Sequence, residues 1–146
     1  MSDTAWLEQA PPPLAPDATT VFRGDLVRPA DLTLSRGRLS VGLTEQPLPR
    51  QVGDDDIERL LLAFEELTSN GLRHGGPPVE VTVTATASGW LIDVTEGSVD
   101  RVPSPAVDRD PAHGGLGLYL VARLCAAHGW AVLRDRKHVW ACVRSG

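Results

Sequence analysis

Cysteine, lysine and long apolar runs are scarce in this chain of 146 residues. Its two cysteines, Cys125 and Cys142, are too few for a disulfide framework and are not spaced like metal ligands, so free, buried thiols are expected. No apolar run approaches the ~20 residues that cross a bilayer, and the N-terminus lacks the pattern of a secretory signal. A net charge of −5 disfavours binding to nucleic acid or anionic membranes. We therefore expect a cytoplasmic protein that contacts neither directly.

The composition fits one folded domain preceded by a tail. Hydrophobic residues make up 42% and charged residues 23% of the chain, as in ordinary globular proteins. Prolines concentrate in residues 1–20, where apolar residues show no period, so this tail is expected to be extended or disordered. No linker or repeat divides residues 21–146, which we expect to form a single domain. Lys137 is the only lysine beside many arginines, and this composition bias leaves it without an assigned role.

Apolar periodicity predicts the order of helices and strands. Spacings of three and four predict helices, and alternation predicts strands. The expected elements are an edge strand at 20–26, helices from 29 to near 47, at 55–74 and at 114–128 with Gly129 as terminator, and strands at 79–84, 90–95, 130–134 and 138–143, the last two joined by a turn at 135–137. This order predicts an α/β two-layer sandwich, with helices packed on one face of a mixed, largely antiparallel sheet.

A polar row follows one side of the second helix. Glu66, Asn70 and His74 are spaced by four and therefore stack along one face. The row lies beside the apolar stripe, so it borders the core, where a cleft can open. A carboxylate and an amide oxygen one turn apart can hold a hydrated Mg²⁺ and orient a water. The same row also fits an ordinary amphipathic helix with a polar shoulder.

Glu96 ends the second strand of the first hairpin. It continues the register of Ile92 and Val94, so it should point toward the core, where a carboxylate needs a partner. A purine amino group would be a suitable partner. The alternative is a glutamate at the strand end that bends into water.

A glycine cluster, Gly114-Gly115-Leu116-Gly117-Leu118, precedes an apolar helix. Glycines that open a helix expose backbone amides, and the helix dipole there favours anions, so this segment can cradle phosphate. It matches neither the P-loop nor the G-x-G-x-x-G pattern. The alternative is that these glycines only allow a sharp turn into a buried helix and bind no ligand.

The order and spacing of these segments resembles the GHKL ATPase superfamily, the Bergerat fold, and within it the small anti-sigma-factor serine kinases. The resemblance covers residues 25–146, and its two main motifs together are fairly specific. Its segments are Glu66-Leu67-Thr68-Ser69-Asn70 with His74-Gly75, then Glu96-x-Ser98, a loop at 97–113, Gly115-Leu116-Gly117-Leu118-Tyr119-Leu120-Val121, and the ending Lys137-His138-Val139-Trp140.

The resemblance implies a histidine-kinase-like ATPase domain at 21–146 that binds ATP and Mg²⁺. Glu66 would be the general base that activates the attacking hydroxyl. Asn70 would bind Mg²⁺, and His74 would line the same pocket. Arg101 or Arg109, on a lid formed by the loop at 97–113, would be candidates to reach phosphate, although nothing distinguishes them from solvated charges.

The remaining nucleotide-binding residues implied by the resemblance are at the base and phosphate ends of the pocket. They are Glu96 and Ser98 on one side, and Gly115, Leu116, Gly117 and Leu118 on the other. One position departs from the family pattern, which has Asp where Glu96 stands and a further glycine after it, in a D-x-G motif. Losing one adenine contact would cost about 1 kcal/mol, or up to about 3 if a buried group stays unpaired. The departure therefore affects nucleotide affinity rather than fold.

The resemblance and its departure at Glu96 lead to two expected functions. The first is an ATP-dependent serine/threonine protein kinase that binds and inhibits a sigma factor and phosphorylates a small antagonist protein. The resemblance also suggests a homodimer, paired through the first helix and first strand. The second is a catalytically degenerate regulatory module of the same fold with weak or absent ATP binding. A histidine-kinase catalytic domain ranks lower, because no helix with a phospho-acceptor histidine is expected before the domain.

Overall fold

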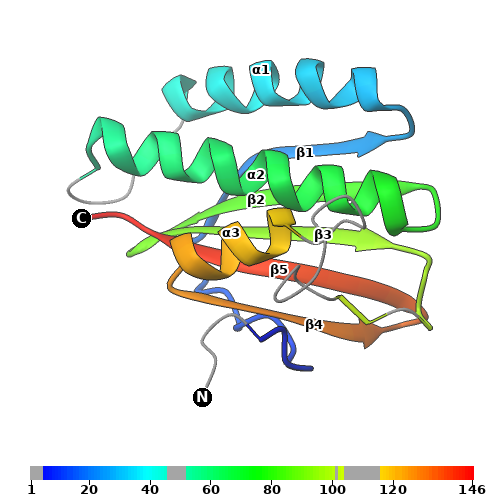
Figure 1. Cartoon of the computed structure of the whole chain (residues 1–146). Coiled ribbons are helices and arrows are strands. Elements are labelled where there is room, and N and C mark those ends of the chain that lie inside the picture. The colour runs from blue at the N-terminus through cyan, green and yellow to red at the C-terminus, as the bar shows by residue number, and fades with distance from the viewer. Residues whose placement is uncertain (1–4, 46–51, 101, 104–115) are drawn as a thin grey trace.

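A computed structural model describes residues 5–45, 52–100, 102–103 and 116–146. These residues form three helices and five strands, arranged as a sheet with the helices on one side (Figure 1). In chain order the elements are β1 (Thr19–Leu26), α1 (Pro29–Glu45), α2 (Asp54–His74), β2 (Val79–Thr86), β3 (Gly89–Glu96), α3 (Leu116–Leu124), β4 (Ala127–Leu133) and β5 (Arg136–Arg144).

The sheet has the strand order β1-β2-β3-β5-β4, and every neighbouring pair is antiparallel. The prediction of an α/β fold with helices packed on one face of the sheet is confirmed. The expected mixture of parallel and antiparallel neighbours is not found among the described strands. The connection through α3 places β4 two positions from β3, and β5 returns between them, so β3 and β4, which run in the same direction, are not neighbours.

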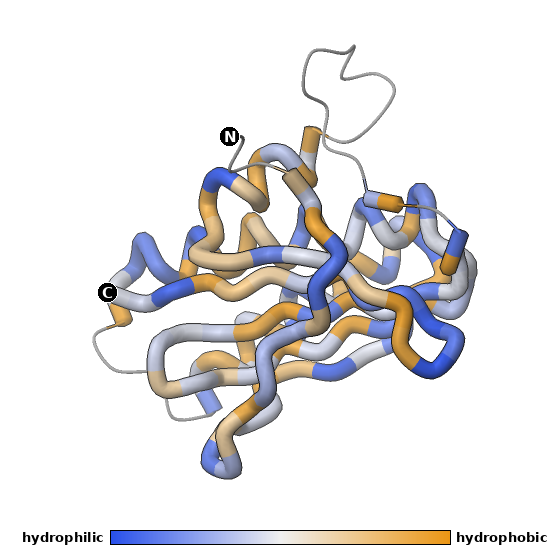
Figure 2. The backbone as a smooth tube through the Cα atoms, turned by 90° about the horizontal axis from the view of Figure 1, so that it is seen from below, coloured by the Kyte–Doolittle hydropathy of each residue, from blue (hydrophilic) through white to orange (hydrophobic). Residues whose placement is uncertain are grey.

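The core lies between the sheet and α2. Residues of β2 alternate, with Val79, Val81 and Val83 buried toward α2, and the tube in Figure 2 shows this alternation of hydropathy along the strands. Phe64 of α2 meets Phe22 of β1 edge to face, with ring centroids 5.6 Å apart. Burying a side chain of this size contributes about 1.5–3 kcal/mol, so this apolar stripe fixes α2 on the sheet.

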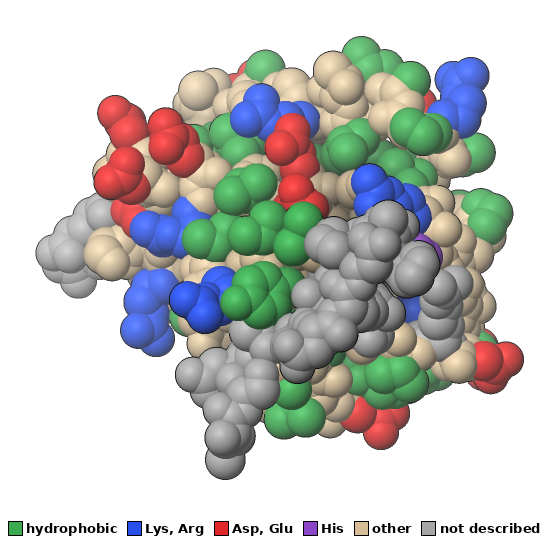
Figure 3. Space-filling model, viewed as in Figure 1, with side chains coloured by type: hydrophobic (Ala, Val, Ile, Leu, Met, Phe, Trp, Pro, Cys, Tyr) green, Lys and Arg blue, Asp and Glu red, His purple; other side chains and the backbone are tan. Residues whose placement is uncertain are grey.

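The start of α2 is stabilised by its own aspartates and by the end of the chain. Figure 3 shows acidic side chains gathered at the end of the molecule where α2 begins. Asp56 Oδ2 accepts hydrogen bonds from the backbone N–H of Gly53 at 2.9 Å and of Gly146 at 3.1 Å. These donors hold the pKa of Asp56 below its ordinary value. The predicted helix boundary, residue 55, is therefore within one residue of the observed Asp54.

The third helix is shorter than predicted, and this prediction is wrong. It ends at Leu124 rather than near 128, and Gly129 lies within β4 instead of terminating a helix. Residues 127 and 128 pair with Cys142 and Ala141 of β5. Sheet hydrogen bonds with β5 therefore outweigh the helical pattern of a locally apolar segment.

The second hairpin turns one residue earlier than predicted. Arg134 and Asp135 have φ values of 52° and 64°, the left-handed conformation of a two-residue hairpin turn. Arg136 and Lys137 consequently belong to β5 rather than to the turn. Because side chains alternate along a strand, this register places Lys137 on the core face of the sheet.

The tail was expected to be extended or disordered, and over residues 5–9, which we call the N-terminal strap, it is extended and hydrogen-bonded to the sheet. The strap is extended and runs beside β4, with an isolated parallel bridge between Glu8 and Trp130. The backbone N–H of Gln9 donates to Trp130 O at 2.7 Å. An unpaired strand edge supplies these bonds, and Trp6 supplies the apolar area that the proline-rich residues lack.

Two further sequence expectations concern membrane spans and the cysteines. Among the described residues, none of the helices combines the length and the hydropathy required of a membrane span. Cys125 and Cys142 are both free and half-buried. Burial raises the pKa of Cys125 to about 12, so this thiol stays protonated at neutral pH.

A histidine–aspartate pair on the sheet face opposite the helices predicts a pH-dependent contribution to stability. His138 Nδ1 lies 3.0 Å from Asp93 Oδ2, and this hydrogen bond raises the pKa of His138 above its ordinary 6.5. The charged imidazole therefore stabilises the fold fully below the pKa of the unfolded state, and the contribution disappears as pH rises through the folded pKa.

Urea unfolding of the wild-type chain and of His138→Gln should therefore differ most at pH values below the ordinary histidine pKa, and the difference should shrink as the pH rises above the raised pKa of the folded state. Asp93→Asn serves as the control, because it removes the partner and should lose the same pH dependence. A stability difference that stays constant across this range would contradict the role of the pair.

Candidate functional site

The polar row of α2 lines a small cavity together with the start of α3. Glu66, Asn70 and His74 are half-buried and face Gly117 and Leu118 across it. Ser69 and Arg73 complete the lining. The cavity has a volume of about 20 Å³, enough for about one water molecule. The structure thus brings together five of the residues that the sequence singled out, from two segments more than forty positions apart.

Glu66 sits in a partly desolvated position. Burial raises the pKa of its carboxyl, the neighbouring charge of Glu65 raises it further, and Arg73 opposes both. The start of α3 packs directly on this side chain, because a Cβ added at Gly117 would overlap Glu66 Oε2. Only glycine at position 117 lets the two helices approach this closely. A carboxylate with a raised pKa is more basic than an ordinary glutamate, which suits it to accept a proton.

Glu96 points into the core, as its strand register predicts, and is fully buried, with an exposed fraction of 0%. Its Oε1 accepts a hydrogen bond from the backbone N–H of Ser98 at 2.9 Å. Lys137 Nζ lies 3.3 Å from its Oε2, and the exposed fraction of Lys137 is 2%. The interaction with Oε2 is an ion pair without hydrogen-bond alignment. The partner of this carboxylate is therefore a cation of the chain itself.

The end of β3 is tied to the end of α2. Ser98 Oγ donates to the carbonyl oxygen of His74 at 3.1 Å, and the N–H of Gly97 donates to Gly76 O at 2.9 Å. A Cβ at Gly75 would overlap the Glu96 carboxylate. Gly75 follows Asn70 by five residues, or about 7.5 Å of helix axis at 1.5 Å per residue. The end of the cavity at His74 therefore adjoins the glycine that packs on the Glu96 carboxylate.

Lys137 is the residue of this site that sequence reasoning missed. Its single occurrence gave it no role, yet its register opposite Glu96 in the β3–β5 pair makes it the counter-ion. If the turn had been predicted to end at Asp135, alternation along the following strand would have placed Lys137 on the core face, opposite Glu96.

Three predicted nucleotide-binding residues in the described part of the chain, Glu96, Ser98 and Leu116, do not line this cavity. Leu116 is the first residue of α3 and is exposed. Gly115, Arg101 and Arg109 lie outside the described residues, as does most of the predicted lid at 97–113.

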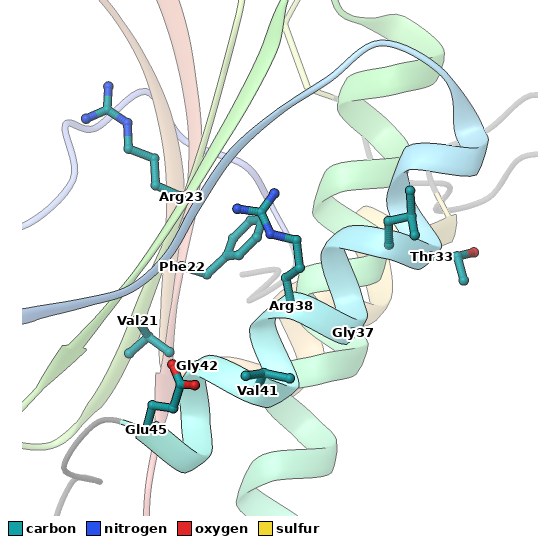
Figure 4. Close-up of a pocket in the computed structure, with 10 residues that line it drawn as sticks. Val21, Phe22, Arg23, Thr33, Gly37, Arg38, Val41, Gly42 and Glu45 are labelled. Carbon is teal, nitrogen blue, oxygen red and sulfur yellow. The ribbon is translucent and has the colours of Figure 1, made fainter.

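A second groove, of about 660 Å³, is lined by residues of α1 and β1 (Figure 4). Its lining includes Val21 and Phe22 of β1, and Leu34 and Val41 of α1. The Arg38 guanidinium lies 5.3 Å above the Phe22 ring. Leu34 and Val41 are exposed, so this groove offers apolar area on the outer edge of the sheet.

The donor atoms of the small cavity fit Mg²⁺ only in combination with ligands from a bound phosphate. In the part of the chain that the structure describes, no three His, Cys, Asp or Glu side chains gather as a metal site. The oxygen donors of Glu66 and Asn70 are the type that Mg²⁺ prefers, and Mg²⁺ is commonly held by one or two protein ligands plus substrate phosphates. Comparison with known proteins found no matching family model and no matching curated protein.

Proposed function

We propose that this chain is an ATP-binding regulatory protein of the Bergerat fold with serine/threonine kinase activity, similar to the anti-sigma-factor kinases. The observation that supports it best is the shared cavity, where Glu66, Asn70 and His74 of α2 face Gly117 and Leu118 of α3. Two motifs of the resemblance, around Glu66-Asn70 and Gly117-Leu118, lie far apart in the sequence, and their meeting at one cavity supports a common nucleotide site. The sheet order and the single helical layer are compatible with this fold.

Each residue of the cavity has a definite task in this proposal. Glu66 accepts the proton of the attacking serine hydroxyl, for which its raised pKa brings it closer to the operating pH. Asn70 holds Mg²⁺, whose chemistry is to neutralise charge on the transferred phosphoryl group. Gly117 lets α3 begin beside Glu66, so that backbone amides at the start of this helix face the phosphates.

The base end of the site sets nucleotide affinity in this proposal. Ser98 and Lys137 already engage Glu96, so a purine amino group must share or replace the Lys137 contact at Oε2. Replacing Glu96 with aspartate withdraws the carboxylate by one methylene from Gly75 and Lys137 and leaves room for the purine.

Glu96→Asp is therefore expected to tighten ATP binding, by up to about 100-fold if a buried polar group gains its partner. Isothermal titration calorimetry with ATP and ADP in the presence of Mg²⁺ measures this directly. Glu80→Asp, a half-buried glutamate of β2, is the matched control and should leave affinity unchanged. Equal or weaker binding by the Glu96→Asp variant would contradict the role of residue 96 in base recognition.

A catalytically degenerate binding module of the same fold is the second candidate. The complete burial of Glu96 and its two partners within the chain favour it, because the carboxylate has no need of a ligand. The same calorimetry distinguishes the two: tight ATP binding by the wild-type chain excludes the degenerate module, and absent binding excludes the kinase.

The partners in this proposal are a sigma factor, a small antagonist protein and a second copy of the chain. The groove between α1 and β1 supports pairing of two copies, since its exposed Leu34 and Val41 would be covered. We expect Val41→Glu to dissociate a dimer in sedimentation equilibrium, while Leu133→Glu, an exposed apolar residue of β4, leaves it intact. A wild-type chain that remains monomeric at high concentration would contradict this arrangement.

A further inference from the structure

The N-terminal strap is fastened to β4 by backbone hydrogen bonds in both directions. The N–H of Gln9 donates to Trp130 O at 2.7 Å, and the N–H of Trp130 donates to Leu7 O at 3.2 Å. The indole N–H of Trp140 donates to Gln9 O at 2.8 Å. The strap thus acts as an additional short strand on an otherwise open sheet edge.

One side chain of the strap reaches past β4 to α3. Trp6 has an exposed fraction of 6% and belongs to the hydrophobic core. Its indole N–H donates to the carbonyl oxygen of Leu118 at 3.2 Å. Its ring packs on His128 with centroids 4.7 Å apart, and Trp130 Nε1 donates to the Trp6 carbonyl at 3.2 Å. His128 and Trp130 of β4 therefore fix the position of Trp6, and Trp6 in turn contacts α3.

The hydrogen bond from Trp6 to Leu118 lies next to the small cavity, because Leu118 is one of its lining residues. Leu118 lines the cavity with Glu66 and Asn70, and it is only two residues from the start of α3. α3 has nine residues, and isolated helices shorter than ~12–15 residues are marginal in water, so its placement depends on tertiary contacts. α2 supplies those contacts on one side and Trp6 supplies one on another.

We propose that Trp6 is a positioning residue that holds the start of α3 against the Glu66 row of α2. When the strap detaches, Leu118 loses both a buried hydrogen bond and the indole packed beside it. The start of α3 then opens locally, and the distance between Gly117 and Glu66 is no longer fixed. This statement about α3 stands without any ligand, and its consequence for nucleotide affinity rests on the proposed function.

The other role for Trp6 is plain core filling, which predicts a different pattern of opening. Loss of a core residue lowers global stability and raises amide exchange throughout the slowest-exchanging elements. Loss of a positioning contact raises exchange chiefly in α3 and leaves α2 and β2 at their original rates. The ratio of exchange rates between α3 and α2 separates these roles.

Hydrogen exchange followed by NMR on the full chain gives this ratio. Trp6→Phe, which keeps a ring and removes the N–H, should raise exchange of α3 amides relative to α2 by up to about tenfold. Trp6→Ala should raise it by more than tenfold. Leu7→Ala, at a neighbouring strap residue whose exposed fraction is 67%, is the matched control and should leave the ratio unchanged.

An unchanged ratio in Trp6→Phe and Trp6→Ala overturns the proposal, as does a uniform rise in all elements. If Trp6→Ala fails to fold, Trp130→Phe replaces it, since it removes the donor to the Trp6 carbonyl and should raise the same ratio. ATP titrations of the same variants then test the consequence, a roughly tenfold weaker affinity for Trp6→Ala.

The two proposals fail separately. A wild-type chain that does not bind ATP, with α3 exchange still raised in the Trp6 variants, refutes the nucleotide site and leaves Trp6 as a positioning residue. If the wild-type chain binds ATP but the Trp6 variants show no change in α3 amide exchange, only the positioning role is refuted.

Discussion

Replacing Glu66 with glutamine is expected to slow phosphoryl transfer by about 10²–10⁴-fold, the usual contribution of a general base, without loss of the fold. Glutamine keeps the shape of the side chain and its packing against Gly117 but cannot accept the hydroxyl proton. The assay follows label from γ-radiolabelled ATP into a synthetic library of serine peptides. Undiminished transfer by the variant would reject the role given to Glu66.

Glu65→Gln is the matched control for this experiment. Glu65 precedes Glu66 on the same helix but points to Arg36, with 2.8 Å between Arg36 Nε and its Oε1. We expect only a small change in transfer, since removing this charge merely lessens the rise in the pKa of Glu66.

The pH profile of the wild-type chain provides a second check on Glu66. Since burial raises the pKa of its carboxyl above 4.5, activity should fall on acidification at a pH higher than an exposed glutamate would give. The acidic limb should disappear in Glu66→Gln.

The parts of the fold that sequence predicted correctly depend on neighbours within one element. α2 begins within one residue of the predicted start and ends at His74, because its apolar stripe and its aspartates are local features. The inward direction of Glu96 followed from strand alternation in the same way. The polar row of α2 was likewise local, and only its meeting with Gly117 required the tertiary structure.

The parts that sequence did not predict depend on pairs of residues far apart in the chain. α3 ends early because residues 127 and 128 pair with β5 and belong to strand β4. The sequence placed Trp6 in the proline-rich tail, and its hydrogen-bond partner Leu118 lies 112 positions away. Lys137 gained its partner through the β3–β5 register, which a one-residue error in the turn concealed. Long-range pairing, rather than local propensity, decided each of these cases.

Substituting methionine for Lys137 is expected to lower the free energy of unfolding by about 3–5 kcal/mol, because it leaves a buried carboxylate without its cation. Glu96 is fully buried, and in the variant its one remaining identified partner is the N–H of Ser98. Urea unfolding monitored by tryptophan fluorescence measures the loss. Arg144→Met, an exposed position on the same strand, is the control and should change stability by no more than about 0.5 kcal/mol.

The double variant Glu96→Gln/Lys137→Met distinguishes a missing charge from a packing defect. A buried ion pair is seldom strongly stabilising as a whole, whereas half of it is costly, so removing both charges should restore most of the lost stability. Glutamine can still accept the Ser98 N–H, and methionine fills much of the volume of the lysine stem. A double variant as unstable as Lys137→Met would show that the lysine acts through packing, and a single variant as stable as the wild type would show that water or another group already compensates Glu96.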